Sequence, residues 1–139
     1  MIRPMSPDQT RALLEAARVG HLGCVAQGTP YVVPVSYMLD GTTIYVHSFV
    51  GHKIRALRQN PRACLQVEEI QDEYNWRSAI AFGRYEEITD ADERRRAVQR
   101  LLARFPHLTP VESVPVHDGQ SSIIVFCIHV EEMSGVCES

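Results

Sequence analysis

The sequence predicts a mainly β protein, a six-stranded antiparallel Greek-key barrel flanked by about three helices. Six strand-like runs are joined by hairpins and short segments, and three helical runs separate them in the order helix, three strands, helix, two strands, helix, strand. This order differs from the strand–helix alternation that builds a parallel doubly wound sheet. The chain has 139 residues, which suits a single domain over residues 1–139, and six strands in such a length are typical of a small barrel.

A helix is expected at the start of the chain. Ser6 can cap it, Pro7 suits the first helical position and Gln9 completes a capping box. Gly20 is expected to end this helix.

The next three elements are expected to be strands. They are predicted at residues 21–27, 31–38 and 43–48. Asp40-Gly41 is a two-residue hairpin signal between the second and the third. Because the connections are short, we expect these three strands to form a meander.

The rest of the chain, from about residue 51, is expected to contain two more helices and three more strands. We expect a helix at about 51–59, strands at 62–69 and 76–88, a helix after Asp90, a loop at 106–120 and a last strand at 121–133. Asn60-Pro61 ends the first of these helices, because the residue before a proline disfavours helical geometry. In the second, Glu93 completes a capping box with Asp90. Its apolar stripe consists of Ala97, Val98, Leu101, Leu102 and Phe105.

Two of the strands have unusual sequences. Pro34 lies within the second strand, so that strand should be an edge or carry a bulge, since proline cannot donate to a ladder. The fifth strand is apolar on both sides, with Trp76, Ser78, Ile80 and Phe82 on one face and Ala79, Ala81 and Gly83 on the other. A strand buried on both faces needs a cover on the outside of the barrel, and a partner subunit is the simplest cover.

Composition excludes several classes of partner. The net charge is −3 and the pI is about 6.0, which gives no electrostatic attraction to nucleic acid or an anionic membrane. The sequence has no apolar run long enough to span a bilayer and no signal-peptide pattern, so we expect a cytoplasmic protein. The cysteines are Cys24, Cys64, Cys127 and Cys137. None forms a C-x-x-C pair, so we expect small buried hydrophobes and predict no metal site.

The segment "VHSFVGHKIRALRQNP" (46–61) is the strongest functional signal. A strand ends at His47 and Ser48, and His52 and Lys53 begin a helix after a glycine. Free N–H groups and a partial positive charge at a helix start favour an anion. An ordinary polar turn is the alternative.

Four motifs, taken in order and spacing, resemble a known family. They are P-V-S-Y (34–37), H-S-x-x-G-H-K (47–53), N-P (60–61) and W-R-S-x-I-x-x-G-R (76–84). From about residue 19 to 135 the chain is similar to the FMN-binding split-barrel proteins related to pyridoxamine 5′-phosphate oxidase. Within that family it most resembles the nitroimidazole-resistance (Nim-like) flavoproteins.

The resemblance implies a homodimer with two FMN sites at its interface. Lys53 would pair with the FMN phosphate, helped by His52 and Ser48. Pro34, Val35 and Ser36 would line the flavin ring, and Trp76, Arg77 and Ser78 would lie at the same site from one subunit or the other. His47, on the strand beside the flavin, would contact the cofactor and be the catalytic residue, the polar group nearest the substrate.

The implied activity is electron transfer from reduced FMN to a small electron-poor substrate, a nitroaromatic or a quinone. A haem- or flavin-binding module without catalysis and an F420-dependent reductase of the same fold are the alternatives. Val136 stands where members of the superfamily often carry a basic residue, and the basic residues that would hold a phosphorylated substrate are not recognisable. Vitamin B6 synthesis is therefore not predicted.

Overall fold

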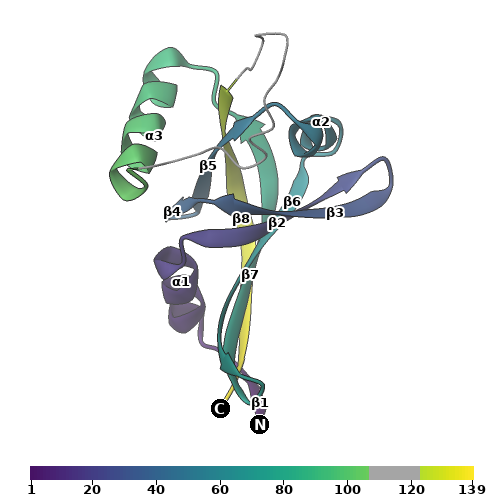
Figure 1. The fold of residues 1–139 in the computed structure, drawn as a ribbon, viewed down its shortest axis with the longest axis vertical. Helices are drawn as coiled ribbons and strands as arrows, with labels where there is room; N and C mark the ends of the chain where they lie inside the picture. The colour runs from purple at the N-terminus through teal and green to yellow at the C-terminus, as the bar shows by residue number, and fades with distance from the viewer. Residues whose placement is uncertain (107–122) are drawn as a thin grey trace.

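A computed structural model describes residues 1–106 and 123–139, and within them it places one antiparallel sheet and three helices (Figure 1). The strands are β1 Ile2–Pro4, β2 Val19–Ala26, β3 Thr29–Ser36, β4 Met38–Asp40, β5 Thr43–Phe49, β6 Arg62–Asp72, β7 Asn75–Glu87 and β8 Ile123–Glu138. The helices are α1 Pro7–Ala16, α2 His52–Gln59 and α3 Ala91–Arg104. The six predicted strands are therefore present, and β1 and β4, of three residues each, are added to them.

The sheet has the order β3-β2-β6-β7-β8-β5-β4, and β1 pairs with β8. Strands far apart in sequence are neighbours, as in the pairs β2–β6 and β5–β8, and the architecture is that of a split barrel. The long strands β7 and β8 run the length of the molecule, and both termini lie at the same end (Figure 1).

The predicted meander of the first three long strands is wrong. β2 and β3 form one hairpin and β4 and β5 form another, but the second hairpin joins β8 at the opposite end of the sheet. Tyr37 lies between the hairpins and is completely buried. Its hydroxyl donates to the Leu14 carbonyl of α1, and its N–H donates to the Arg18 carbonyl at 3.2 Å. These bonds hold the chain against α1 and direct β4 away from β3.

The helix starts follow the sequence closely. Ser6 and Gln9 form the predicted capping box of α1, and the Asp90 side chain accepts from the Glu93 N–H at the start of α3. The predicted end of α1 is wrong, because the helix stops at Ala16 and Gly20 belongs to β2. A Cβ at Gly20 would lie 2.9 Å from a Leu65 methyl group, so its small size serves strand packing.

Of the two expectations for individual strands, one is confirmed and one is wrong. β3 is an edge strand, which confirms the expectation from Pro34. β8 continues to Glu138 instead of ending at residue 133, because β7 and β1 pair along its extra length. The predicted loop at 106–120 lies outside the described residues, apart from Pro106.

The inner face of the sheet forms the main core, together with α1 and α2. A second, smaller cluster lies on the outer side, where α3 covers Val125 and Cys127 of β8. Ala97 and Leu101 are the buried residues of α3, whereas Leu102 is 45% exposed, so the predicted stripe is too wide by this residue. Not all of the predicted apolar residues of α3 are buried, because α3 packs on only one end of the sheet.

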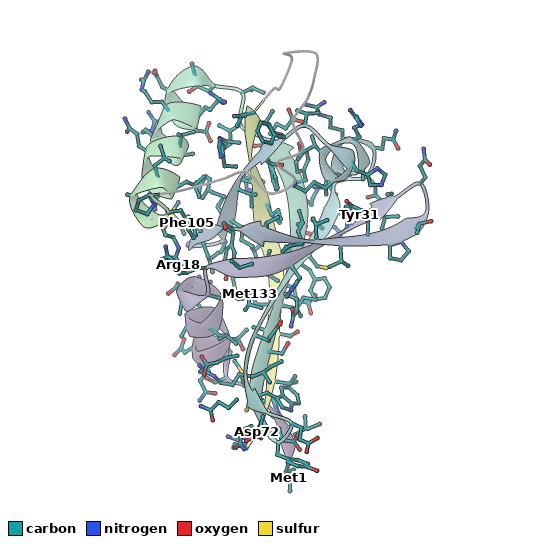
Figure 2. All side chains as sticks on the ribbon, viewed as in Figure 1. Met1, Arg18, Tyr31, Asp72, Phe105 and Met133 are labelled. Atoms are coloured by element: carbon teal, nitrogen blue, oxygen red, sulfur yellow. The ribbon has the colours of Figure 1, made fainter. Side chains whose placement is uncertain are left out.

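Arginine side chains fix the C-terminal end of α3. The Arg18 guanidinium lies 4.7 Å from the centre of the Phe105 ring (Figure 2). Arg104 donates to the carbonyls of Glu15 and Ala17 at 3.0 and 2.9 Å, which ties α3 to the end of α1.

In the part of the chain that the structure describes, no helix is long and apolar enough to cross a membrane.

Candidate functional site

One stretch of the outer sheet face carries both apolar and polar side chains, and no described helix covers it. We call it the open outer face, and it consists of His21, Val32, Pro34, Cys64, Gln66, Ser78, Ile80 and Phe82. The strand register places these residues on one side of β3, β2, β6 and β7. Val32 is 63% exposed and Phe82 38%, so this apolar surface is accessible in the single chain.

A row of hydrogen bonds crosses this face. The Nδ1 atom of His21 lies 3.1 Å from Oε1 of Gln66, and Nε2 of Gln66 donates to the Ser78 hydroxyl at 3.0 Å. The Glu68 carboxylate is 3.6 Å from the same His21 nitrogen. The row therefore presents donors and acceptors between apolar neighbours, an arrangement typical of sites for small ligands.

The three predicted residues of β3 point in different directions. Pro34 lies opposite His21 and is exposed, and Ser36 faces the same side. Val35 is completely buried in the core, so only its backbone could meet a ligand. Because β3 is an edge strand, part of its backbone is not paired with β2 and is available to a ligand or a second chain.

The predicted anion site lies where β5 leads into α2. His52 is exposed and its ring contacts Tyr31 of β3, with ring centres 4.6 Å apart. Ser48 and Lys53 are completely buried, and the Ser48 hydroxyl donates to the Phe49 carbonyl at 2.8 Å. Gly51 precedes the helix and makes no side-chain cap, so among the described residues the first N–H groups of α2 have no capping side chain.

Two of the three predicted residues at the start of β7 lie in a separate pocket. Trp76 and Arg77 line a pocket of about 210 Å³ beside the C-terminal end of β8. The Trp76 indole N–H donates to Glu138 at 3.1 Å, and Arg77 pairs with Glu69 at 2.7 Å. Ser78 alone of the three predicted residues takes part in the polar row.

His47 lies on the side of β5 that faces α3, away from Ser48. It is half-buried, and its Nδ1 atom is buried without a hydrogen-bond partner among the described residues. Burial, and in smaller part the Arg94 charge, lower the pKa of His47 below its ordinary value. The imidazole is therefore mainly neutral near pH 7 and does not carry the second ring proton that a general acid would donate.

The structure thus joins Pro34, Ser36 and Ser78 on one face and places Ser48, His52 and Lys53 together at the start of α2. Sequence reasoning missed His21 and Gln66, which form the centre of the polar row. The signal available was alternation, because each lies between residues that face the core in its strand.

A groove adjoins the open outer face. It has a volume of about 290 Å³ and is lined by residues that include Tyr31, Val32, Cys64 and Phe82. This pocket and the one at Trp76 are both below the range of about 300–1,000 Å³ typical of small-molecule sites. A larger ligand would need a further surface to enclose it.

Comparisons with known proteins place the chain in a family. The family model for pyridoxamine 5′-phosphate oxidase matches residues 6–136. An uncharacterized protein of Rhizobium meliloti (strain 1021) is 30% identical over 96% of this chain and 93% of its own length. The crystal structure of an FAD-binding protein of Mesorhizobium loti is 31% identical, covers 100% of this chain and 99% of that one, and has a TM-score of 0.86. A putative 5-nitroimidazole antibiotic resistance protein of Bacteroides thetaiotaomicron shares the fold at 22% identity, with coverage of 99% and 87% and a TM-score of 0.77.

Proposed function

This chain belongs to the pyridoxamine 5′-phosphate oxidase family, and on that premise we propose that it binds a flavin against the open outer face and uses it to reduce a small electron-poor substrate. The polar row of His21, Gln66 and Ser78 within an otherwise apolar sheet face is the observation that carries the proposal. The similarity to a protein described as FAD-binding supports a flavin as the ligand.

The open outer face suits the chemistry of a flavin ring. The ring system is flat and largely apolar, with donors and acceptors along its pyrimidine edge. Val32 and Phe82 offer apolar surface for the ring, and the row of His21, Gln66 and Ser78 offers partners for the polar edge. Among the described residues, the side of β3 that does not pair with β2 adds further donors and acceptors beside Pro34.

The start of α2 suits the flavin phosphate. A phosphate carries about −1.5 to −2 charges and binds well to uncapped helix N–H groups and to cations. Lys53 and the exposed His52 would supply these groups. Because α2 packs on the inner side of the sheet and His52 contacts Tyr31 of the edge strand β3, the flavin chain would have to pass this edge. The Lys53 ammonium is fully enclosed, so a phosphate reaches it only if the atoms that cover it move. Ser48 already donates to Phe49 and would first have to turn its hydroxyl to help.

The sequence resemblance names FMN, and the similar Mesorhizobium loti protein is described as binding FAD. Both molecules carry the same ring and the same first phosphate, so the assignment of Lys53 holds for either. FMN is our first choice, because neither pocket described above offers a recognisable place for an adenosine group.

A second copy of the chain is the proposed cover for the flavin. Both pockets are small, and the open outer face exposes Val32 and Phe82. A homodimer would bury these side chains and close the flavin between two chains. Arg77 faces the other side of β7 from Ser78 and Trp76 lines the separate pocket, so we propose that their contribution comes from the partner subunit.

A bound flavin supplies the electron-transfer chemistry, and the chain supplies position, proton transfer and the exclusion of water. The polar row orients a ligand at its polar edge, and Val32 and Phe82 exclude water from its face. The sequence names His47 for proton transfer, but His47 faces α3 and lies away from the polar row, so it can act only on a substrate that reaches this side of β5. Because its imidazole is mainly neutral, His47 must take a proton from solvent before it can deliver one.

Ligand titrations test the flavin and its phosphate contact. We expect FMN to remain bound after desalting and Lys53→Met to weaken FMN binding by about 10–100-fold, the value of a charge-assisted hydrogen bond. Riboflavin lacks the phosphate, so its affinity should be the same in both proteins. Arg55→Met is the matched control, since Arg55 is an exposed cation on the same helix.

Equal losses for FMN and riboflavin in Lys53→Met would contradict the phosphate contact. If Lys53→Met does not fold, His52→Gln tests the same site from an exposed position. No retention of FMN or FAD by the native chain would contradict the flavin proposal itself, and preference for F420 or a haem spectrum would identify the other ligands of this fold.

Turnover tests the activity separately from binding. The flavin-loaded protein should reduce a nitroaromatic or a quinone, with reduced nicotinamide as the electron source, faster than the same concentration of free flavin. His47→Gln should slow this reaction and leave flavin affinity unchanged. A rate equal to that of free flavin would make the protein a flavin carrier without catalysis.

A further inference from the structure

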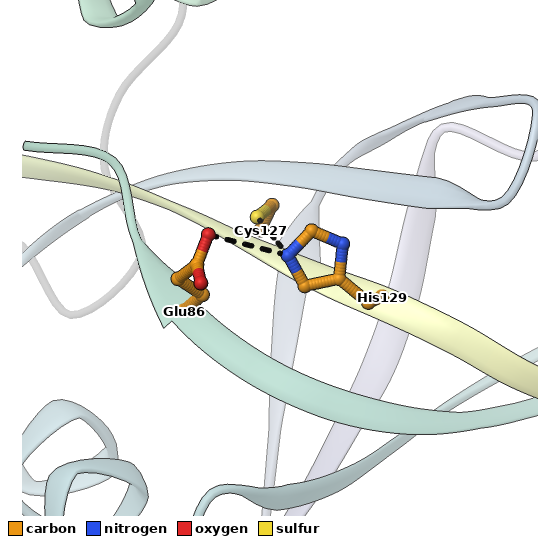
Figure 3. A group of neighbouring side chains, drawn as sticks. All are labelled: Glu86, Cys127 and His129. Carbon is orange, nitrogen blue, oxygen red and sulfur yellow. Dashed lines mark hydrogen bonds and ion pairs between the residues drawn. The ribbon is translucent and has the colours of Figure 1, made fainter. Parts of the chain in front are cut away.

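Three side chains of the kinds that ligate metals meet where β7 and β8 pair, next to α3. They are Glu86, Cys127 and His129, which we call the β7–β8 cluster (Figure 3). The Nε2 atom of His129 lies 3.4 Å from the Cys127 sulfur and 3.4 Å from Oε1 of Glu86. The ligand atoms of all three residues lie within 4.8 Å of one another.

The strand register builds this cluster. Cys127 and His129 are two positions apart in β8 and therefore face the same side of the sheet. Glu86 lies directly opposite Cys127 on β7. The register shifts between Phe82 and Gly83, and a Cβ at Gly83 would lie 2.2 Å from the His129 carbonyl oxygen. Glycine at this position thus allows the close approach of β7 to the backbone that carries His129.

The two distances from the His129 nitrogen are compatible with ligands of one tetrahedral metal. Zinc binds sulfur at about 2.3 Å and nitrogen or oxygen at about 2.0–2.2 Å, so its ligand atoms stand about 3.3–3.6 Å apart. Both distances from the His129 nitrogen lie in this range. A direct N–H···O hydrogen bond is usually about 2.9–3.0 Å, so the contact with Glu86 is long for one.

The charges around the Cys127 thiol favour a cation. Burial, and after it the nearby carboxylates of Glu86 and Glu93, raise the pKa of the Cys127 thiol to about 11. A divalent cation at the cluster would offset these charges and stabilise the thiolate. Arg84 lies opposite His129 in the strand register, and its positive charge would oppose a bound cation. Its side chain is exposed to water, which weakens this effect.

We propose that Glu86, Cys127 and His129 bind one Zn²⁺ ion per chain, with a fourth position open to water. A thiolate and an imidazole favour zinc over magnesium or calcium, which prefer oxygen ligands. The spacing Cys127-x-His129 is no recognised metal motif, and the third ligand comes from another strand, which explains why the sequence predicted no site. The proposal does not depend on the flavin.

Zinc titration of the tag-free protein as purified tests the site. Competition with a chromophoric zinc chelator should show one Zn²⁺ per chain, and Co²⁺ should give the intense visible bands of a tetrahedral site with a thiolate charge-transfer band, measured as a difference spectrum. His129→Gln and Glu86→Gln should each weaken zinc binding by at least about tenfold, comparable to the loss of a supporting group. Cys127→Ser should abolish the thiolate band.

Control variants separate this cluster from other ligands on the chain. His21→Gln, Glu131→Gln and Cys64→Ser remove the same three side-chain types elsewhere and should leave the zinc affinity unchanged. His129 and Glu86 are 52% and 69% exposed, so their variants should fold even if Cys127→Ser does not. No stoichiometric zinc, or an affinity that His129→Gln and Glu86→Gln leave unchanged, would overturn the proposal.

Discussion

The outer face of the sheet has two halves, of which one is covered by α3 and the other is exposed. At one end α3 lies on β8 and β5, and Val125 and Leu101 are completely buried. At the other end, Phe82 of β7 and Val32 of β3 remain exposed among the described residues. The chain therefore covers one half with its own helix and leaves the other half accessible.

The difference indicates what the open half is for. Each Å² of apolar surface left in water forgoes about 25 cal/mol of stabilisation. Contiguous apolar surface rimmed by polar groups marks a place for a ligand or another chain. The hydrogen-bonded row lies in the open half, whereas the covered half buries its apolar residues as an ordinary core does.

Alanine substitutions should separate the two halves most strongly. Leu101→Ala in the covered half should lower the free energy of unfolding by about 2–5 kcal/mol, because it leaves a cavity. Phe82→Ala should cost less, and its cost should grow with protein concentration if a second copy covers this side chain. Urea unfolding at two protein concentrations measures both effects. If both variants lose the same unfolding free energy at both protein concentrations, the two halves do not differ as described.

A charge placed in the open half tests the proposed second copy. Ile80 lies in the open outer face opposite Gln66, so Ile80→Asp should raise the dimer dissociation constant at least about tenfold, the effect of about 1.4 kcal/mol. Leu102→Asp, at an exposed apolar position of α3, is the control and should leave association unchanged. Sedimentation equilibrium measures both, and a native chain that is monomeric at all concentrations would contradict the dimer.

The smallest expected effect concerns the acid stability of the covered half. The pKa of His47 is lower in the folded chain than its ordinary value of 6.5. The unfolded chain therefore binds the proton first, so the stability from neutral His47 is present above pH 6.5 and is lost as the pH falls through the folded pKa.

The unfolding free energy should thus fall below pH 6.5, and His47→Gln should make this fall shallower. His21→Gln, in the open half, is the matched control. Urea unfolding at pH 7.5 and 5.5 measures the difference, and an unchanged pH dependence in His47→Gln would contradict the assignment.

Local signals in the sequence predicted most of the fold. Ser6 and Asp90 cap their helices because the relevant contacts lie within one turn. Pro34 identified an edge strand because its missing N–H rules out a central position. The role of Tyr37 could not be predicted from local signals. Its hydrogen bond to α1 connects segments that are distant in sequence, and this contact separates the two hairpins.

The candidate site was predicted only in part for the same reason. Lys53 and His52 are adjacent in sequence, so their grouping at a helix start was visible. The polar row needs His21, Gln66 and Ser78 from three strands, and only the register aligns them. Motif order placed Arg77 with Ser78, but alternate residues of a strand face opposite sides, and Arg77 pairs with Glu69 instead.

Hydrogen–deuterium exchange with and without FMN would locate the flavin on the chain. We expect slower exchange in β3, at the start of α2 and in the first half of β7, with no change in α3. Slower exchange confined to α3 and β4, or no change in any segment at saturating FMN, would contradict a flavin site on the open outer face.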